Sequence, residues 1–411
     1  MMSTKAVRLD QLTDLTPITD TTGTDPDGTY ARLREEWGPV APVELEPGLP
    51  AWLVMGYQDV CEVVHNEEVF SRSGANWALK DRLTRTSGLI PWATVRENAF
   101  NHDGDSRRTL RAPLDDGLAD LDEHPFARRV RRACEMIMDD FRYRGSADLF
   151  AEYGALVPLL AFAEMFGLDD ERAQQMVTFT RQVMSTGADA AEGIWNLHVL
   201  LREHIALRRE QPARDLTTSF VQHPNFMIGG ADPDHRIVNA ISLMITAGYE
   251  MTVGLLVKTL LLMLADRRFS HRLRRGRLDV DQAIEEVLWR EPPAYNIPLR
   301  FALTDVELSG RLIRRGDAVV PSAYTAHSDP VMSGEDPWAE VGNKAHLAFS
   351  TGRHACPARR AGLIIVRTAV QAALDDLPDV ALAMPPEQMR RISGSLWARY
   401  PVELPVTFTR A

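Results

Sequence analysis

Residues 349–362 read FSTGRHACPARRAG and place one cysteine, Cys356, among arginines. Gly352 and Pro357 flank it, and an apolar helical pattern, LIIVRTAVQAAL, follows directly. The N-terminus of a helix stabilises a thiolate, because free N–H groups and the helix dipole favour negative charge there. The pattern therefore predicts a thiolate that serves as a nucleophile or as a metal ligand.

Several roles for Cys356 can be compared on sequence grounds. A buried structural cysteine suits Cys61 and Cys134, since each lies within an amphipathic helical pattern. A zinc site needs more Cys or His at close spacing, and only His354 is near. A Cys-His hydrolase needs a distant partner that the sequence does not identify. An axial ligand to haem iron needs a single cysteine on a rigid loop, with cations for the propionates.

Composition limits the class of protein. The chain has 411 residues and a net charge of −11, which disfavours nucleic acid and anionic membranes as partners. Three widely separated cysteines form no disulfide framework, so we expect a reducing cytoplasm. The N-terminus lacks the apolar stretch of a signal peptide, and no window is expected to reach a membrane span.

Patterning along the chain predicts a mainly α protein with a small β portion. We expect a single domain over 1–411, with a loosely ordered segment at 1–30 and an irregular stretch at about 71–105. Helical periodicity dominates from about 106 to 290. A helix from about 233 to 264 is apolar almost all round, which predicts burial through the centre of the molecule.

The cysteine stretch resembles the haem-binding loop of the cytochrome P450 family. Phe349, Gly352, His354 and Cys356 match that loop, and Ala358 replaces its usual glycine. Three further segments, DGDSRRTLR, AGYEMT and NIPLR, resemble family segments in the same order. The resemblance implies the P450 fold and haem b with Cys356 as axial thiolate ligand.

The resemblance also implies cofactor contacts from Phe349, Gly352, His354 and three arginines. Arg300 corresponds to the strand arginine that reaches a propionate. Arg107 stands where the family usually has histidine, and Arg111 keeps its place. Their i, i+4 spacing puts both guanidinium groups on one helical face, able to grip a carboxylate. The alternative for this pair is a solvated basic face.

One departure from the family lies in the helix EEVLWREPP. Glu286 is in place, but Trp289 stands where the family's Glu-x-x-Arg has its arginine, a variation that some bacterial P450 subfamilies share. The arginine of the following meander is also absent from DPWAEVGNK. We expect that the ion network was replaced as a unit, through packing of Trp289 and Trp338.

The central helix carries a second departure. Ala247 and Gly248 form its kink and Glu250 is the acid, but Met251 stands where the family has threonine, and Thr252 follows one residue later. Methionine cannot organise a proton-donating water. Either Glu250 and water deliver the proton, or the chemistry is oxidative coupling rather than hydroxylation. A third interpretation is that Met251 only fills the core.

The predicted substrate pocket is mostly apolar and aromatic, which favours a mid-sized, partly aromatic natural product such as a cyclic dipeptide, polyketide or aromatic compound. Any one of its residues could instead pack the core. The candidates are Trp77, Leu89, Ile90, Trp92, Leu243, Thr246, Tyr249, Asn296, Ile297, Leu396 and Trp397.

Electrons must come from outside, because the chain has no flavin or nicotinamide fingerprint. Arg353, Arg359 and Arg360 favour docking of an acidic ferredoxin served by a ferredoxin reductase, although they could equally face solvent or a propionate. The alternative function is a non-catalytic haem binder, or an auxiliary protein for a partner biosynthetic enzyme.

Overall fold

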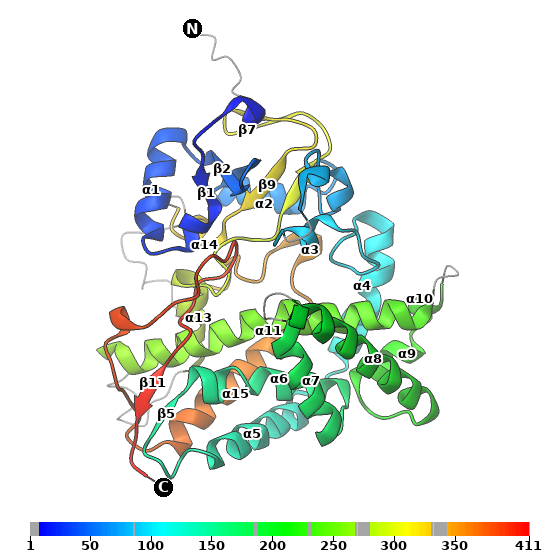
Figure 1. Cartoon of the computed structure of the whole chain (residues 1–411), viewed down its shortest axis with the longest axis vertical. Coiled ribbons are helices and arrows are strands. Elements are labelled where there is room, and N and C mark those ends of the chain that lie inside the picture. Colours follow the sequence, from blue (N-terminus) through cyan, green and yellow to red (C-terminus); the bar gives the residue numbers. More distant parts are fainter. Residues whose placement is uncertain are drawn as a thin grey trace. The chain divides into compact units, whose positions relative to one another are not determined.

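The computed structural model describes residues 8–84, 87–183, 188–228, 232–267, 269, 280–329, 332 and 343–410. The chain divides into two compact units (Figure 1). Unit 1 comprises Met1–Arg107, Glu285–Cys356 and Ile392–Arg399, and unit 2 comprises Arg108–Ile284, Pro357–Arg391 and Tyr400–Ala411. Each unit is described by itself, and the expectation of a single domain over 1–411 stays a prediction.

Unit 1 is built on a six-stranded sheet with the order β1-β2-β3-β9-β6-β4. Strands β2 and β3 form an antiparallel pair, and the parallel partner of β3 is β9. Alternating apolar residues of these strands are fully buried on both faces, Trp52 on one and Leu53 on the other. The strands are β1 (Thr16–Pro17), β2 (Val40–Glu46), β3 (Leu49–Val54), β4 (Phe70–Ser71), β6 (Arg300–Ala302) and β9 (Ala318–Pro321), with a separate pair, β7 (Val306–Leu308) and β8 (Arg311–Ile313).

Short helices accompany this sheet. They are α1 (Pro26–Trp37), α2 (Tyr57–His65), α3 (Ile90–Ala93) and α14 (Ala323–His327). The first begins with Pro26 at its first turn, and the Asp25 side chain accepts a hydrogen bond from the Gly28 N–H. This is a favourable start for a helix.

The expected loose segment at 1–30 differs from the structure from residue 8 onward. Strand β1 pairs with β2, and Leu9 and Ile18 are buried in the two apolar clusters on the sheet. Burial of these isolated apolar residues orders a segment whose composition alone predicts a loop. Residues 1–7 lie outside the described residues.

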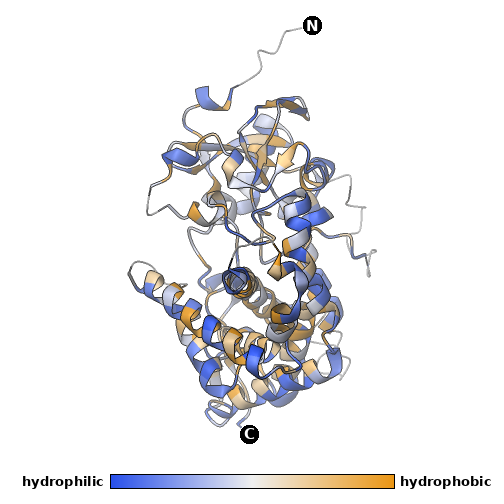
Figure 2. Ribbon diagram, turned by 90° about the vertical axis from the view of Figure 1, so that its right-hand side faces the viewer, coloured by the Kyte–Doolittle hydropathy of each residue, from blue (hydrophilic) through white to orange (hydrophobic). Residues whose placement is uncertain are grey.

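Unit 2 is mainly helical. Its longest helix, α11 (Pro233–Ala265), is contacted by α6 (Val157–Phe166), α8 (Ala188–Glu210) and α15 (Arg359–Asp376). Hydrophilic and hydrophobic residues alternate along the helical ribbons (Figure 2), as expected where one face is buried. The other helices are α5 (Glu123–Asp139), α7 (Asp170–Val183), α9 (Leu216–Gln222) and α10 (Pro224–Met227).

Two further helices cross the boundary between the units, and a small sheet completes unit 2. The helices are α4 (Gly104–Ala119) and α13 (Val280–Arg290). The sheet has the order β10-β11-β5, formed by Ala381–Leu382, Pro405–Thr407 and Ser146–Asp148. Helix α11 agrees with the helix predicted from about 233 to 264 and ends one residue later, at Ala265.

Helix α11 is long and apolar enough to cross a membrane by length and composition. The expectation that no window approaches a membrane span is therefore wrong on those two measures. However, 56% of the apolar window is buried inside the protein, as in the core helix of a globular protein.

Candidate functional site

The loop that carries Cys356 is closed by its own backbone. The Cys356 N–H donates to the Phe349 carbonyl over 2.9 Å, and the Ala355 N–H donates to the Gly352 carbonyl over 3.1 Å. Gly352 has a φ of +71°, and a Cβ there would lie 3.0 Å from the Val64 carbonyl oxygen. Glycine is required for both reasons. The closed loop leaves the Cys356 side chain exposed.

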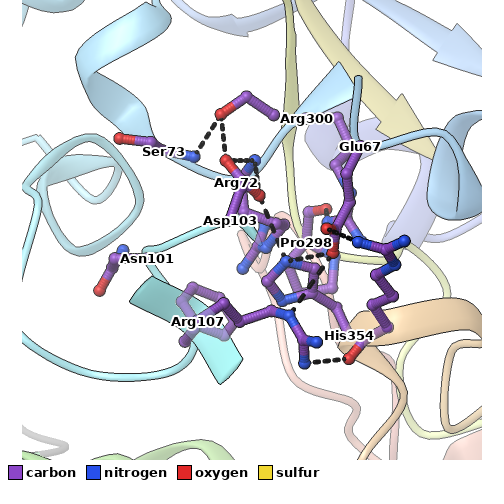
Figure 3. A network of polar contacts seen from close by, with 12 residues as sticks. Glu67, Arg72, Ser73, Asn101, Asp103, Arg107, Pro298, Arg300 and His354 are labelled. Atoms are coloured by element: carbon purple, nitrogen blue, oxygen red, sulfur yellow. Dashed lines mark hydrogen bonds and ion pairs between the residues drawn. The ribbon is translucent and has the colours of Figure 1, made fainter. Parts of the chain in front are cut away.

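His354 is clamped between two carboxylates. Its Nε2 lies 3.3 Å from Asp103 Oδ1 and 3.3 Å from Glu67 Oε1 (Figure 3). Burial lowers the pKa of His354 to about 3, although its hydrogen bond to Asp103 acts in the opposite direction. Burial would raise the pKa of Asp103, but hydrogen bonds from His354, Ser71 and the Arg72 N–H outweigh it and lower the pKa to about 2. The imidazole is therefore neutral beside an ionised carboxylate at pH 7.

Three arginines surround this clamp within unit 1. Arg107 donates to the Arg353 carbonyl over 2.8 Å and holds its Nε 3.7 Å from Glu67. Arg72 lies with its guanidinium carbon 3.8 Å from the centre of the Phe100 ring and donates to the Leu299 carbonyl.

Arg300 is almost fully buried and donates to the Pro298 carbonyl over 3.1 Å. Burial lowers its pKa to about 10, while Asp103 and Glu67 act in the opposite direction. Arg72 is also buried, and burial together with the charge of Arg300 lowers its pKa. Arginine side chains stay cationic in proteins, so the charge of Arg300 is unfavourable for the nearby Arg72.

Each of these arginines keeps one buried nitrogen that has no hydrogen-bond acceptor within the described part of the chain. These nitrogens are Nη2 of Arg72, Nε of Arg107 and Nε of Arg300. Buried donors of this kind are costly unless an acceptor satisfies them. An anionic ligand with carboxylate groups, such as a haem with its two propionates, fits this donor set.

Arg111 has a different local partner. Its Nε lies 2.7 Å from Oδ1 of Asp115, one turn later on α4. The Arg111 side chain keeps only 14% of its area accessible and Arg107 is buried, so neither arginine lies on a freely solvated basic face. The role of Arg111 at a cofactor stays a prediction.

In unit 2, α11 carries the predicted acid. Burial raises the pKa of the Glu250 carboxyl, which accepts a hydrogen bond from the Tyr400 hydroxyl over 3.3 Å. The Thr252 hydroxyl donates to the Gly248 carbonyl over 2.7 Å, so it is bonded to the backbone of its own helix one turn earlier. Met251 is half-buried and Ala247 is exposed.

The small residue Gly248 admits a neighbouring ring. A Cβ at this position would lie 3.1 Å from Cζ of Phe162 on α6. Within unit 2, Gly248 therefore lets an aromatic side chain approach the helix backbone closely.

The predicted substrate residues separate into two groups by burial. Trp77, Leu89, Asn296 and Ile297 are buried in unit 1, where packing of the core is the interpretation that burial favours. Asn296 illustrates this, because its amide donates to the Leu396 carbonyl over 2.9 Å and its carbonyl accepts from Tyr30.

The remaining candidates keep accessible surface. Trp92 and Trp397 touch in unit 1, with ring centroids 4.6 Å apart, and Ile90 and Leu396 are partly buried beside them in the chain. On α11, Leu243 is half-buried, Thr246 donates to the Ser242 carbonyl, and Tyr249 donates to the Ala155 carbonyl over 3.2 Å. A substrate role for all of these residues stays a prediction.

Sequence reasoning missed four polar residues of these sites: Glu67, Arg72, Asp103 and Tyr400. Asp103 opens the segment DGDSRRTLR, so its position in a recognised segment was an available signal. The other three reach their partners through contacts far apart in sequence, such as the 286 positions between Glu67 and Arg353. No local pattern marks such residues.

Comparison with known proteins assigns the fold. No family sequence model matches the chain. The 2-hydroxy-5-methyl-1-naphthoate 7-hydroxylase of Streptomyces carzinostaticus is 24% identical, covering 94% of this chain and 96% of that protein. Nocardicin C N-oxygenase of Nocardia uniformis is 28% identical, covering 95% and 98%. The solved structure of CYP154C4 from a Streptomyces species matches with a TM-score of 0.84 at 22% identity, covering 97% and 99%.

The fold is therefore the cytochrome P450 fold. The chain is a relative of the bacterial cytochrome P450s, and named relatives are cytochrome P450 monooxygenases. This family implies a haem with a cysteine thiolate as axial ligand. The exposed cysteine and the unsatisfied buried arginine donors of unit 1 fit such a group.

Proposed function

We propose that the chain is a haem-thiolate oxidoreductase that acts on a mid-sized, partly aromatic natural-product intermediate. The observation that carries the proposal is the exposed Cys356 at the end of a closed loop, in the unit that also holds three arginines with unsatisfied buried donors. One cysteine with cations for two carboxylates is what a haem-thiolate site requires.

The proposed chemistry requires an iron ligand, cations for the propionates and a proton donor. In unit 1, Cys356 would ligate the iron, and Arg72, Arg107 and Arg300 would hold the propionates. In unit 2, burial raises the pKa of the Glu250 carboxyl, which favours its protonated form. A bound haem-thiolate supplies oxygen activation, leading either to oxygen insertion or to hydrogen abstraction from the substrate.

The chain leaves both monooxygenation and oxidative coupling open as reactions. Met251 carries no hydroxyl, and the Thr252 hydroxyl is bonded to the helix backbone. Proton delivery during oxygen activation would therefore depend on Glu250 in either reaction. Counting oxygen atoms in the product by mass spectrometry separates the two reactions.

The substrate class is supported by residue chemistry and by the relatives. The aromatic pair of Trp92 and Trp397 offers stacking surface within unit 1. A naphthoate hydroxylase and a nocardicin N-oxygenase are among the similar proteins, and both are named for aromatic or natural-product chemistry.

A ferredoxin with its reductase is the proposed electron source, and the cytoplasm the proposed location. Arg353 keeps 57% of its side-chain area accessible although it lies 3.5 Å from Glu67, so it could still contact an acidic partner. Arg360 is ion-paired with Glu123 within unit 2, which leaves less of its charge for a partner.

The first experiment is the absorption spectrum of the reduced protein under carbon monoxide. We expect a strongly red-shifted Soret band that is lost in Cys356→Ser, with helix content unchanged by circular dichroism. The matched control is Cys61→Ser, which removes a half-buried thiol from α2 and should keep the band. A red-shifted band that persists in Cys356→Ser would refute the ligand assignment.

The alternative is a P450-fold protein without catalysis, favoured by Met251 and Trp289 at positions where the family carries threonine and arginine. It predicts a normal thiolate spectrum but no substrate-dependent consumption of NADPH with a ferredoxin and reductase. Consumption coupled to product with any compound of a natural-product panel would exclude it.

A further inference from the structure

Glu250 and Tyr400 form a hydrogen-bonded pair inside unit 2, although they are 150 positions apart. We propose that Tyr400 is the positioning residue of Glu250 and supplies the acid with the hydroxyl partner that Met251 cannot offer. This inference deepens the proposed function, because it concerns the proton route of that same reaction.

The tyrosine is held in place from several directions. Its side chain is 7% exposed, and its ring stacks on Phe150 with centroids 6.4 Å apart and an interplanar angle of 29°. The segment that follows is pinned by its backbone, since the Leu404 N–H donates to Asp148 over 2.8 Å and the Leu404 carbonyl accepts from Leu149. These contacts fix the position of the Tyr400 hydroxyl.

Helix α11 is anchored at the same turn. Tyr249, directly before the acid, donates to the Ala155 carbonyl over 3.2 Å, and Phe162 fills the space beside Gly248. The turn Phe150–Gly154 also contacts α11, because a Cβ on Gly154 would lie 2.9 Å from Val257. Acid and hydroxyl thus belong to two fixed elements, unlike a surface pair that forms and breaks freely.

Neighbouring hydroxyls on α11 are committed elsewhere. Thr252 donates to the Gly248 carbonyl and Thr246 donates to the Ser242 carbonyl. Tyr249 is bonded to Ala155. Tyr400 is therefore the hydroxyl that the described residues direct at the Glu250 carboxyl.

This pairing controls protonation of the acid. Burial raises the pKa of Glu250, and the hydrogen bond from Tyr400 lowers it, because the hydroxyl stabilises the ionised form. Tyr249 also faces Glu250, and Arg181 acts electrostatically on that tyrosine. Removing the Tyr400 hydroxyl leaves the burial effect unopposed, so the carboxyl should stay protonated to a higher pH.

The test is a pH titration of the Glu250 carboxyl by infrared difference spectroscopy of the purified full-length protein. The protonated-carboxyl band is assigned by its loss in Glu250→Gln. In Tyr400→Phe we expect the midpoint to rise by about 1 pH unit, which is the effect of one hydrogen bond to a charged group. Tyr153→Phe is the control, since its buried hydroxyl donates to the Ala369 carbonyl instead.

A second substitution should shift the midpoint of the Glu250 titration in the opposite direction. It keeps the proposal testable if Tyr400→Phe misfolds. Difluorotyrosine at position 400 is a stronger hydrogen-bond donor of nearly the same shape, so the midpoint should fall. Equal midpoints in wild type, Tyr400→Phe and the difluorotyrosine protein would overturn the proposal. Because the infrared titration requires no turnover, it stands apart from the carbon monoxide spectrum, whose failure would refute only the proposed haem-thiolate function.

Discussion

The ring of Trp289 lies 5.0 Å from the imidazole of His327, and its indole N–H donates to the Asn343 carbonyl over 2.7 Å. The ring of His346 meets the same indole edge-on, at 6.0 Å and 87°. Trp289 thus belongs to a layer of aromatic and imidazole rings. Replacement of the ion network through packing of Trp289 and Trp338 stays a prediction, because Trp338 lies outside the described residues.

An arginine at position 289 should therefore lower the free energy of unfolding. In Trp289→Arg a cation would stand beside two imidazoles and the indole hydrogen bond would be lost, which we expect to cost about 3 kcal/mol of unfolding free energy. Trp289→Phe keeps a ring but loses the bond to Asn343, at about 1 kcal/mol. Urea denaturation measures both, and a Trp289→Arg protein as stable as wild type would contradict the packing argument.

Lowering the pH should destabilise the protein, because the buried His327 must take up a proton. Burial and the nearby His346 lower its pKa to about 3, against a hydrogen bond to the Trp289 carbonyl that raises it. Its Nε2 accepts from the Leu347 N–H over 2.7 Å, so protonation there breaks that bond. The unfolded chain binds one more proton between about pH 6.5 and 3, so stability is full above pH 6.5 and falls below it.

The corresponding measurement is the urea midpoint at pH 7, 6 and 5. Each such histidine adds a slope of up to about 1.4 kcal/mol per pH unit in that window. His327→Gln should remove one proton from this dependence, whereas His124→Gln, at an exposed position of α5, should not. An unchanged slope in His327→Gln would show that the imidazole is not held neutral.

Local patterns predicted the parts of the fold and site that are local in sequence. The apolar run gave α11 with its end displaced by one residue, and the spacing around Cys356 gave a closed loop that needs Gly352. Both depend on short-range backbone geometry, which neighbouring residues determine.

Long-range contacts account for what the sequence could not predict. Ile18 orders the N-terminal segment only because the sheet offers an apolar face, and composition near it indicates a loop. Glu67 and Tyr400 stand in unremarkable local sequence, and each contacts a partner more than a hundred positions away. Burial of Trp77 and Asn296 likewise results from tertiary contacts, so residue type alone could not separate pocket residues from core residues.

Arg300→Ala should raise the stability of the apoprotein but weaken its binding of haem. Without an anion, the buried guanidinium keeps an unsatisfied Nε and is disfavoured by Arg72, so its removal should stabilise the apoprotein by about 1 kcal/mol. With haem, the loss of a charge-assisted hydrogen bond should weaken binding at least about tenfold.

Haem titration and urea denaturation of the apoprotein check the two signs separately. The control is Arg311→Ala, which removes a half-buried arginine that donates to the Trp37 carbonyl in the same unit and should not affect haem affinity. If Arg300→Ala lowers apoprotein stability and haem affinity together, Arg300 stabilises the fold and does not act specifically on the haem.

Met251→Thr tests whether the missing hydroxyl limits oxygen chemistry. It places a hydroxyl directly after Glu250, at a half-buried position of α11, and should cost about 1 kcal/mol of stability through the smaller, β-branched side chain. If proton delivery limits the wild-type protein, the variant should release less hydrogen peroxide per NADPH consumed. The matched control is Met251→Val, which has the same shape without the hydroxyl, so equal peroxide release from the two variants would show that a hydroxyl at this position does not determine the reaction.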